Sequence, residues 1–280
     1  MNDYVSFGNT AGLGSSQFTL EIWFKKDGAG ISVQTDTNGV IAIPLISKGR
    51  MEGEGSNLDM NYFLGIDYAT NTLCADFEEG SGQANPGKNH PIKGVTPICN
   101  FRWYHAAVTF NGNSFVLYLN GVPENTLSIN AFPQSASIQH ASIGSALNST
   151  GAASGFFNGR LDEARIWNYA RTQTQIDSNF TVEIISAPGL QGRWGMNEGI
   201  GTICQNSGLA SNAQGNLLNG ASWINGSPFT PSTTQQNFGL ALEGINSYVS
   251  FGNNPNLGLS QFTLETWFMR NGPGSYSSSG

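Results

Sequence analysis

Two acidic residues stand two positions apart in the stretch Leu73–Glu78. Successive side chains of a strand point to opposite faces, so Asp76 and Glu78 would share one face of a strand there. Two carboxylates held in this way can perform acid–base catalysis on glycosidic bonds, or accept hydrogen bonds from sugar hydroxyls. A solvated strand edge carries the same pattern, and we expect that role ahead of a catalytic one.

Asp162 is the second acidic residue with a notable position, in the strand-like stretch Phe156–Trp167. Strict alternation places Asp162 on the same face as Ala164 and Ile166, which are core residues by type. A carboxylate that points inward must be paired, hydrogen-bonded or bound to a metal ion. Calcium suits it, because calcium accepts carboxylate and backbone carbonyl oxygens, and a hydrogen bond to the backbone is the alternative.

Aromatic side chains beside amides and carboxylates are the ingredients of a carbohydrate site. Alternation puts Glu21 and Trp23 together on the polar face of the stretch Phe18–Lys25. The ligand-binding candidates are Glu21, Trp23, Tyr62, Asp76, Glu78, Trp103 and Tyr104. The alternative for each aromatic residue is a place in the core, where most aromatic residues of a β-sandwich lie.

The composition argues against several other functions. The net charge is −7, and the twelve Lys and Arg residues form no basic cluster, so we expect no nucleic-acid partner. The longest apolar runs, such as Gly39–Ile46, have the length of a strand, so we expect no membrane insertion. The three histidines accompany no Gly-x-Ser-x-Gly motif, and no Gly-x-x-x-x-Gly-Lys-Ser loop is present, so hydrolase and nucleotide-binding signatures are missing.

The three cysteines cannot all pair within one chain. Cys74 and Cys99 flank one loop almost symmetrically, so a disulfide between them is one alternative. Buried free thiols are the other, and we favour it. No Cys-x-x-Cys pattern points to zinc.

Alternating apolar and polar residues indicate the elements that must position these side chains. Phe18, Leu20, Ile22 and Phe24 share one face of a strand, and Asn111–Ser114 forms a Gly-containing hairpin loop between two further strands. The main helical signal is at Thr172–Ile176, where Thr172 and Gln175 have the spacing of a capping box. One short helix among many strands predicts an all-β fold, an antiparallel two-sheet sandwich.

The sequence repeats itself at its two ends. Residues 4–30 and 248–274 are identical at eighteen of twenty-seven positions, at a constant offset of 244 residues. A period of that length corresponds to a whole sandwich domain. We expect a first domain at 1–187, an inter-repeat strand segment at 188–247 that closes the first or opens the second sandwich, and the truncated start of a second copy at 248–280.

The order of five stretches resembles a known family: YVSFG, FTLEIWF, WYHAAVTFNG, GFFNGRLDEARIWNYARTQTQI and RWGMNEGIGT followed by NLLNGASW. It is similar to the bacterial LamG-like jelly-roll domain of the concanavalin A-like lectin/glucanase superfamily, related to laminin G and pentraxin domains. The resemblance implies two antiparallel sheets in a jelly roll, repeated in secreted or surface-anchored proteins, that bind glycans or proteins.

The resemblance also implies site residues. A structural calcium would be held by Asp162 with oxygens near the first strand, where Asn2 and Asp3 are the nearest positions. The glucanases of the superfamily carry a Glu-x-Asp-x-x-Glu strand motif, but here Cys74 stands where its leading Glu belongs. We therefore expect no enzyme.

The leading hypothesis is a non-catalytic recognition or adhesion module that binds a glycan or a surface protein. It would belong to a larger secreted or cell-surface protein with neighbouring tandem jelly rolls. A purely structural spacer is the alternative, and a glycoside hydrolase is the third.

Overall fold

The computed structural model describes residues 2–53 and 57–228. The strands are β1 (Tyr4–Gly8), β2 (Phe18–Lys26), β3 (Val33–Gln34), β4 (Ile41–Lys48), β5 (Tyr62–Asp67), β6 (Thr72–Asp76), β7 (Ile92–Pro97), β8 (Trp103–Phe110), β9 (Ser114–Leu119), β10 (Val122–Ser128), β11 (Ala141–Ile143), β12 (Ser145–Leu147), β13 (Ala153–Phe156), β14 (Gly159–Trp167), β15 (Leu190–Trp194), β16 (Ile203–Cys204) and β17 (Gly215–Leu218). The helices are the 3₁₀ turn η1 (Ala11–Leu13) and α1 (Gln173–Asn179).

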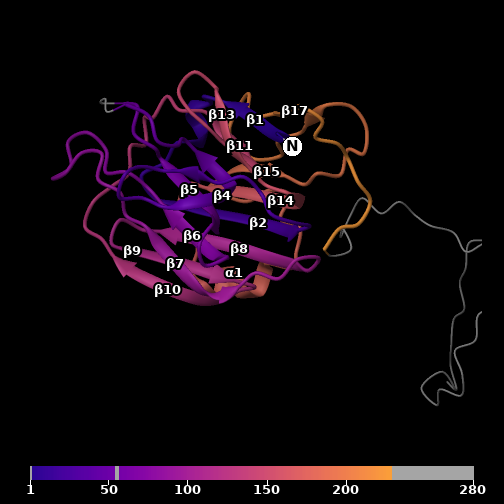
Figure 1. Ribbon diagram of the computed structural model, residues 1–280, viewed down its shortest axis with the longest axis horizontal. Helices are drawn as coiled ribbons and strands as arrows, with labels where there is room; N and C mark the ends of the chain where they lie inside the picture. The colour runs from indigo at the N-terminus through magenta and orange to yellow at the C-terminus, as the bar shows by residue number, and fades with distance from the viewer. Residues whose placement is uncertain (1, 54–56, 229–280) are drawn as a thin grey trace, which may run out of the picture. The chain divides into compact units, whose positions relative to one another are not determined.

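Two antiparallel sheets form the sandwich, as Figure 1 shows. The larger sheet has the strand order β16-β17-β1-β11-β4-β5-β6-β7, with β3 added beside β4. The second sheet has the order β10-β9-β8-β2-β14-β15, and β12 pairs with β13 in a separate ribbon. Neighbours that are far apart in sequence, such as β2 and β14, are the mark of a jelly roll, and the predicted fold class is confirmed.

The core lies between the two sheets and is rich in aromatic rings. Phe18 from β2 contacts Tyr62 from β5 and Phe110 from β8, with ring centroids 5.5 and 5.9 Å apart. Phe7 of β1 stacks on Trp194 of β15 at 3.8 Å. The predicted inward face of β2 is therefore the core face, and burial of these large apolar side chains is the main stabilising contribution.

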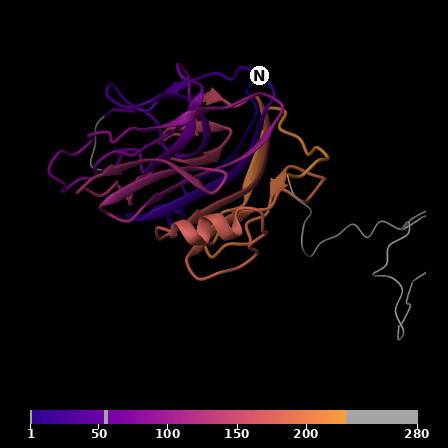
Figure 2. The ribbon, with the colours of Figure 1, turned by 90° about the horizontal axis from the view of Figure 1, so that it is seen from below.

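The outer face of the six-stranded sheet is covered by α1, which lies outside the two sheets in Figure 2. Ile176 of α1 packs against Ala107 and Tyr118 on that face. Thr172 accepts a hydrogen bond from the Gln175 backbone, and the Gln175 side chain accepts one from the Thr172 N–H. The predicted capping box is present, and it fixes the start of the helix.

The segment after α1 adds strands to both sheets of the same sandwich. β15 pairs with β14, while β17 pairs with β1. Residues 188–228 thus complete the first sandwich, which is one of the two alternatives expected for 188–247. The remainder of that segment and the second copy at 248–280 lie outside the described residues.

All three cysteines are free thiols in the structure. Cys74 and Cys204 are buried, and Cys99 is exposed. Cys74 is therefore a buried free thiol, as the favoured alternative expects. Cys99 is also a free thiol, but it is exposed to solvent.

Candidate functional site

Glu21 does not face solvent, although alternation assigns it to a polar strand face. It is fully buried, and its Oε1 atom accepts hydrogen bonds from Trp167 Nε1 at 2.7 Å and Arg171 Nη1 at 2.6 Å. Burial by itself raises the pKa of Glu21, but the His105 imidazole, whose Nε2 lies 3.4 Å from Glu21 Oε2, and the charges of Arg165 and Arg171 bring it down to about 2. Glu21 anchors an internal ionic network, and no ligand reaches it in this conformation.

Trp23 lies beside this network on the same outer face. Its Nε1 donates a hydrogen bond to the Phe180 carbonyl at 2.7 Å, and its ring stacks on the Phe180 ring with centroids 5.9 Å apart. His105 packs against both rings at 5.6 Å. Trp23 therefore holds the segment after α1 onto the sheet, and its ring is covered.

The other aromatic candidates do not form a common surface with Glu21 and Trp23. Tyr62 and Tyr104 belong to the core between the sheets, and the Tyr62 hydroxyl donates to the Leu13 carbonyl at 2.9 Å. Trp103 is half-buried at the start of β8. Tyr62 and Tyr104 therefore have the alternative role given above, that of core residues.

Asp76 and Glu78 are buried, not solvated, which corrects the expected edge position. Asp76 accepts hydrogen bonds from the Thr35 hydroxyl at 2.6 Å and the His90 backbone N–H at 2.9 Å. Burial raises the pKa of Asp76 to about 7. Burial and then the nearby carboxylates raise the pKa of Glu78 to about 8. Thr35 contacts Asp76, whereas Glu78 accepts hydrogen bonds from the Met60 N–H and from Asn89, and strand alternation does not reveal these long-range contacts.

Asp162 does not share a face with Ile166, because β14 contains a β-bulge. Asp162 lies opposite Trp23 on β2, whereas Ile166 lies opposite Leu20. Directly opposed residues share a face, so Asp162 is on the outer face and Ile166 on the core face. The bulge occurs next to Glu163, whose φ of 48° is in the left-handed region.

The residues expected to bind calcium do not come together as a site. The Asp162 oxygens accept hydrogen bonds from Ser227 Oγ and the Glu163 N–H, both at 2.9 Å. Asn2 and Asp3 are exposed, and Asp3 lines a pocket that Asp162 does not line. Within residues 2–53 and 57–228 no group of three or more His, Cys, Asp and Glu side chains is placed to hold a metal ion. As arranged, Asp162, Asn2 and Asp3 do not fit a calcium site. The Asp162 carboxylate instead accepts hydrogen bonds from its neighbours, one of them a backbone N–H.

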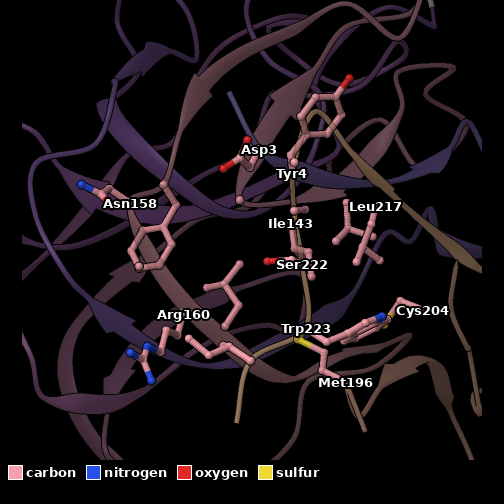
Figure 3. Close-up of a pocket in the computed structure, with 18 of the residues that line it drawn as sticks. Asp3, Tyr4, Ile143, Asn158, Arg160, Met196, Cys204, Leu217, Ser222 and Trp223 are labelled. Atoms are coloured by element: carbon pink, nitrogen blue, oxygen red, sulfur yellow. The ribbon is translucent and has the colours of Figure 1, made fainter. Parts of the chain in front are cut away.

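A pocket of about 320 Å³ opens where β1, the start of β14 and the segment after β17 meet (Figure 3). Its aromatic lining residues are Tyr4, Phe157 and Trp223. Its polar lining residues are Asp3, Asp27, Asn158, Arg160 and Ser222. Apolar walls with a few convergent polar groups are the usual construction of a small-molecule site.

The polar groups of the pocket are held by the surrounding structure. The Trp223 indole donates to the Gly201 carbonyl at 2.8 Å, which fixes a ring that is still half-exposed. Arg160 Nε lies 3.5 Å from Asp27 Oδ2 in a partly exposed ion pair. The Asn158 amide donates to the Ala29 carbonyl at 3.2 Å. The pocket therefore offers a positioned aromatic face together with hydrogen-bond donors and acceptors.

Sequence reasoning did not identify this pocket, and Asp3 is the single candidate residue that lines it. Trp223 ends the stretch NLLNGASW, and Arg160 stands in GFFNGRLDEARIW, and both stretches resemble the family. The sequence does not indicate that these two stretches lie side by side, because their proximity depends on the pairing of β17 with β1.

The fold and its pocket define a class: a two-sheet jelly-roll β-sandwich with a pocket lined by strands of both sheets. Residues 1–177 match the model of the family Laminin_G_3, described as the concanavalin A-like lectin/glucanases superfamily. The chain belongs to this family, so the resemblance found in the sequence is confirmed. No curated protein sequence matches the chain.

Three solved structures are similar to this chain at low sequence identity. A protein from Bacteroides ovatus ATCC 8483, described as carbohydrate binding, is 19% identical with a TM-score of 0.54; the match covers 78% of this chain and 56% of that one. Ruminococcus gnavus IT-sialidase CBM40 bound to α2,3 sialyllactose is 12% identical with a TM-score of 0.46, covering 64% and 93%. The heptameric SAP-like pentraxin from Limulus polyphemus is 16% identical with a TM-score of 0.37, covering 63% and 80%.

Among the described residues, no helix is long and apolar enough to cross a membrane.

Proposed function

We propose that this domain binds a carbohydrate, without cleaving it, in the pocket beside Trp223. The observation that carries the proposal is the composition of that pocket: three aromatic side chains with two carboxylates, an amide, a guanidinium and a hydroxyl around about 320 Å³. Sugars combine apolar C–H faces with hydroxyl groups that donate and accept hydrogen bonds, so they match such a lining. The family membership and the Bacteroides ovatus protein of the same fold support a carbohydrate ligand.

The arrangement of carboxylates favours binding over hydrolysis. Glycoside hydrolysis requires two carboxyl groups that flank the scissile bond, one of them free to act as an acid. In the pocket, Asp27 is paired with Arg160 and Asp3 is exposed at the rim. Asp76 and Glu78 are buried elsewhere and do not line the pocket.

The same proposal places the domain in a larger secreted or cell-surface protein with tandem jelly rolls. The repeat of residues 4–30 at 248–274 supports it. The coding sequence on both sides of this chain tests it, and an absence of any further jelly-roll sequence or export signal there would count against it.

The binding test uses the full chain on a glycan array, followed by calorimetry with the best ligand. We expect Trp223→Ala to weaken binding at least tenfold, since an apolar sugar face that covers the indole buries apolar area, and burial of a large apolar side chain contributes about 1.5–3 kcal/mol. Tyr68→Ala is the matched control, because Tyr68 is an exposed aromatic residue that does not line the pocket. Thermal melting of both variants checks that they fold.

No glycan bound by the wild-type chain would refute the carbohydrate ligand. Binding that Trp223→Ala leaves unchanged would show that the pocket is not the site.

A further inference from the structure

An aromatic and two basic side chains stand in one row across the six-stranded sheet. Lys25 of β2 lies directly opposite Trp103 of β8 on one side and Arg160 of β14 on the other. Directly opposed residues of antiparallel strands project from the same face, with Cβ atoms about 5 Å apart, so the three side chains are neighbours. We call Trp103, Lys25 and Arg160 the basic row.

The basic row lies on the outer face of the sheet. In the adjacent register, Phe24 lies opposite Tyr104 and Leu161, and these three side chains pack in the core between the sheets or against it. Alternation along each strand turns the next residue to the other face. All members of the row are half-buried, so they keep exposed surface that a ligand on this face can contact.

The polar groups of the basic row have few partners within residues 2–53 and 57–228. There, the side chains of Lys25 and Trp103 form no hydrogen bond and no ion pair. Arg160 Nε lies 3.5 Å from Asp27 Oδ2 but donates no hydrogen bond. In Figure 3 the Arg160 guanidinium points away from the Trp223 ring. The donors of the row are therefore available to a ligand outside the pocket.

The charges of the row leave positive charge without a partner. Lys25 and Arg160 are both positive, and the carboxylate paired with them is Asp27. Asp162 follows on the same face of β14, but it is 7% exposed, and burial raises its pKa to about 7, so it carries part of a negative charge at neutral pH. The row is thus a local excess of positive charge on a chain of net charge −7.

We propose that the basic row binds the carboxylate of an acidic sugar residue, whose ring lies against Trp103. A planar guanidinium matches a carboxylate with two parallel hydrogen bonds, and the Lys25 ammonium adds another charge-assisted donor. Arg160 also lines the pocket beside Trp223, so this subsite rests on the proposed function, and one oligosaccharide would reach from the pocket onto the row.

The overall charge favours a carboxylated sugar over a densely sulfated chain. The net charge of −7 repels a polyanion as a whole, whereas the attraction of the row is screened beyond about 8–10 Å. A sugar with a single carboxylate at the row satisfies the local excess of positive charge and brings little further negative charge to the rest of the surface.

The experiment compares glycans that differ in the carboxylate alone. An array carries uronic-acid and sialic-acid oligosaccharides beside their carboxyl-reduced forms, and calorimetry with the full chain gives the Kd of the best-bound pair. We expect the carboxylated member to bind about tenfold more tightly, which corresponds to one charge-assisted hydrogen bond. Lys25→Gln should lower that ratio by about threefold or more, because Arg160 remains.

Two further variants test the other parts of the row. Trp103→Ala should weaken both members of the pair, since it removes the apolar surface under the sugar ring. Lys88→Gln is the matched control, because Lys88 is an exposed positive charge outside the row and the pocket, and it should leave both Kd values unchanged. Thermal melting checks that each variant folds.

Equal Kd values for the two members of every pair would overturn the carboxylate subsite. The proposed function would still stand if a neutral glycan bound in a way that Trp223→Ala weakens, whereas no binding of any glycan would refute both. A ratio that Lys25→Gln leaves unchanged would show that the row does not read the carboxylate. Heparin that binds more tightly than every carboxylated glycan without sulfate would also count against the subsite.

Discussion

Replacing Glu21 by Gln removes the negative charge at the centre of the ionic network under α1. Arg171 is 4% exposed, and its guanidinium has Glu21 and the Gln175 carbonyl as its polar partners. Arg165 keeps Glu163, 3.1 Å away, and so loses less. The substitution preserves the shape of the side chain, so its main effect is a buried guanidinium without a counter-charge.

The loss of stability follows from the burial of the Glu21–Arg171 pair and from the pKa of Glu21. Removing one partner of a buried ion pair destabilises a protein by about 3–5 kcal/mol. The pKa of Glu21 falls from 4.5 to about 2 on folding, which at about 1.4 kcal/mol per pKa unit corresponds to about 3 kcal/mol. We therefore expect Glu21→Gln to lower the free energy of unfolding by about 3–5 kcal/mol at neutral pH.

The pH dependence supplies a second, sign-sensitive check. Because the pKa of Glu21 is lower in the folded chain, its contribution is complete above pH 4.5 and is lost as the pH falls to about 2. Glu21→Gln should lack this part of the acid destabilisation, so the difference between the two proteins should shrink over that range.

The assay is urea unfolding followed by tryptophan fluorescence, since Trp167 contacts Glu21 directly. Asp177→Asn is the matched control: it removes a carboxylate from the exposed surface of α1 and should change stability by less than about 0.5 kcal/mol. A loss for Glu21→Gln that equals the control, or a difference that does not depend on pH below 4.5, would refute the ionic-network argument.

Three smaller predictions follow from single contacts. Thr172→Ala removes the N-cap of α1 and should lower the free energy of unfolding by about 1 kcal/mol; unchanged urea denaturation would contradict the capping role. Cys99 should react with a thiol reagent in the native protein, and Cys74 and Cys204 after unfolding, so native labelling of more than one thiol would be inconsistent with their burial. Burial lowers the pKa of His105 below 6.5, so the unfolded chain binds the proton more readily and stability should fall as the pH drops below 6.5; a flat profile there would contradict it.

Local sequence patterns predicted the elements because local physics determines them. Alternation identified the core face of β2, and a Gly-containing loop identified the hairpin of β8 and β9. Thr172 and Gln175 identified the start of α1, since a capping box needs two residues three positions apart. Each of these features depends on contacts within a few residues or on one strand period.

The candidate site was harder to predict because it depends on contacts between distant segments. Alternation correctly separates Glu21 from the core face, but it cannot show that Arg171, 150 residues away, covers it. The same limit applies to Asp76, which the loop at Thr35 covers, and to Trp223, which reaches the pocket by the pairing of β17 with β1. A one-residue bulge beside Glu163 was enough to move Asp162 to the other face.

The strand pairing of residues 4–30, the first copy of the repeat, shows which part of the chain folds as one unit. Residues 4–30 contain β1 and β2, and these two strands enter different sheets. β1 is held between β11 and β17, and β2 is held between β8 and β14. A stretch of this length therefore has no sheet of its own, because every backbone partner of its strands comes from residues 103–218. The unit that folds is the sandwich closed by β17, which explains why the strands after residue 188 belong to the domain that begins at Tyr4.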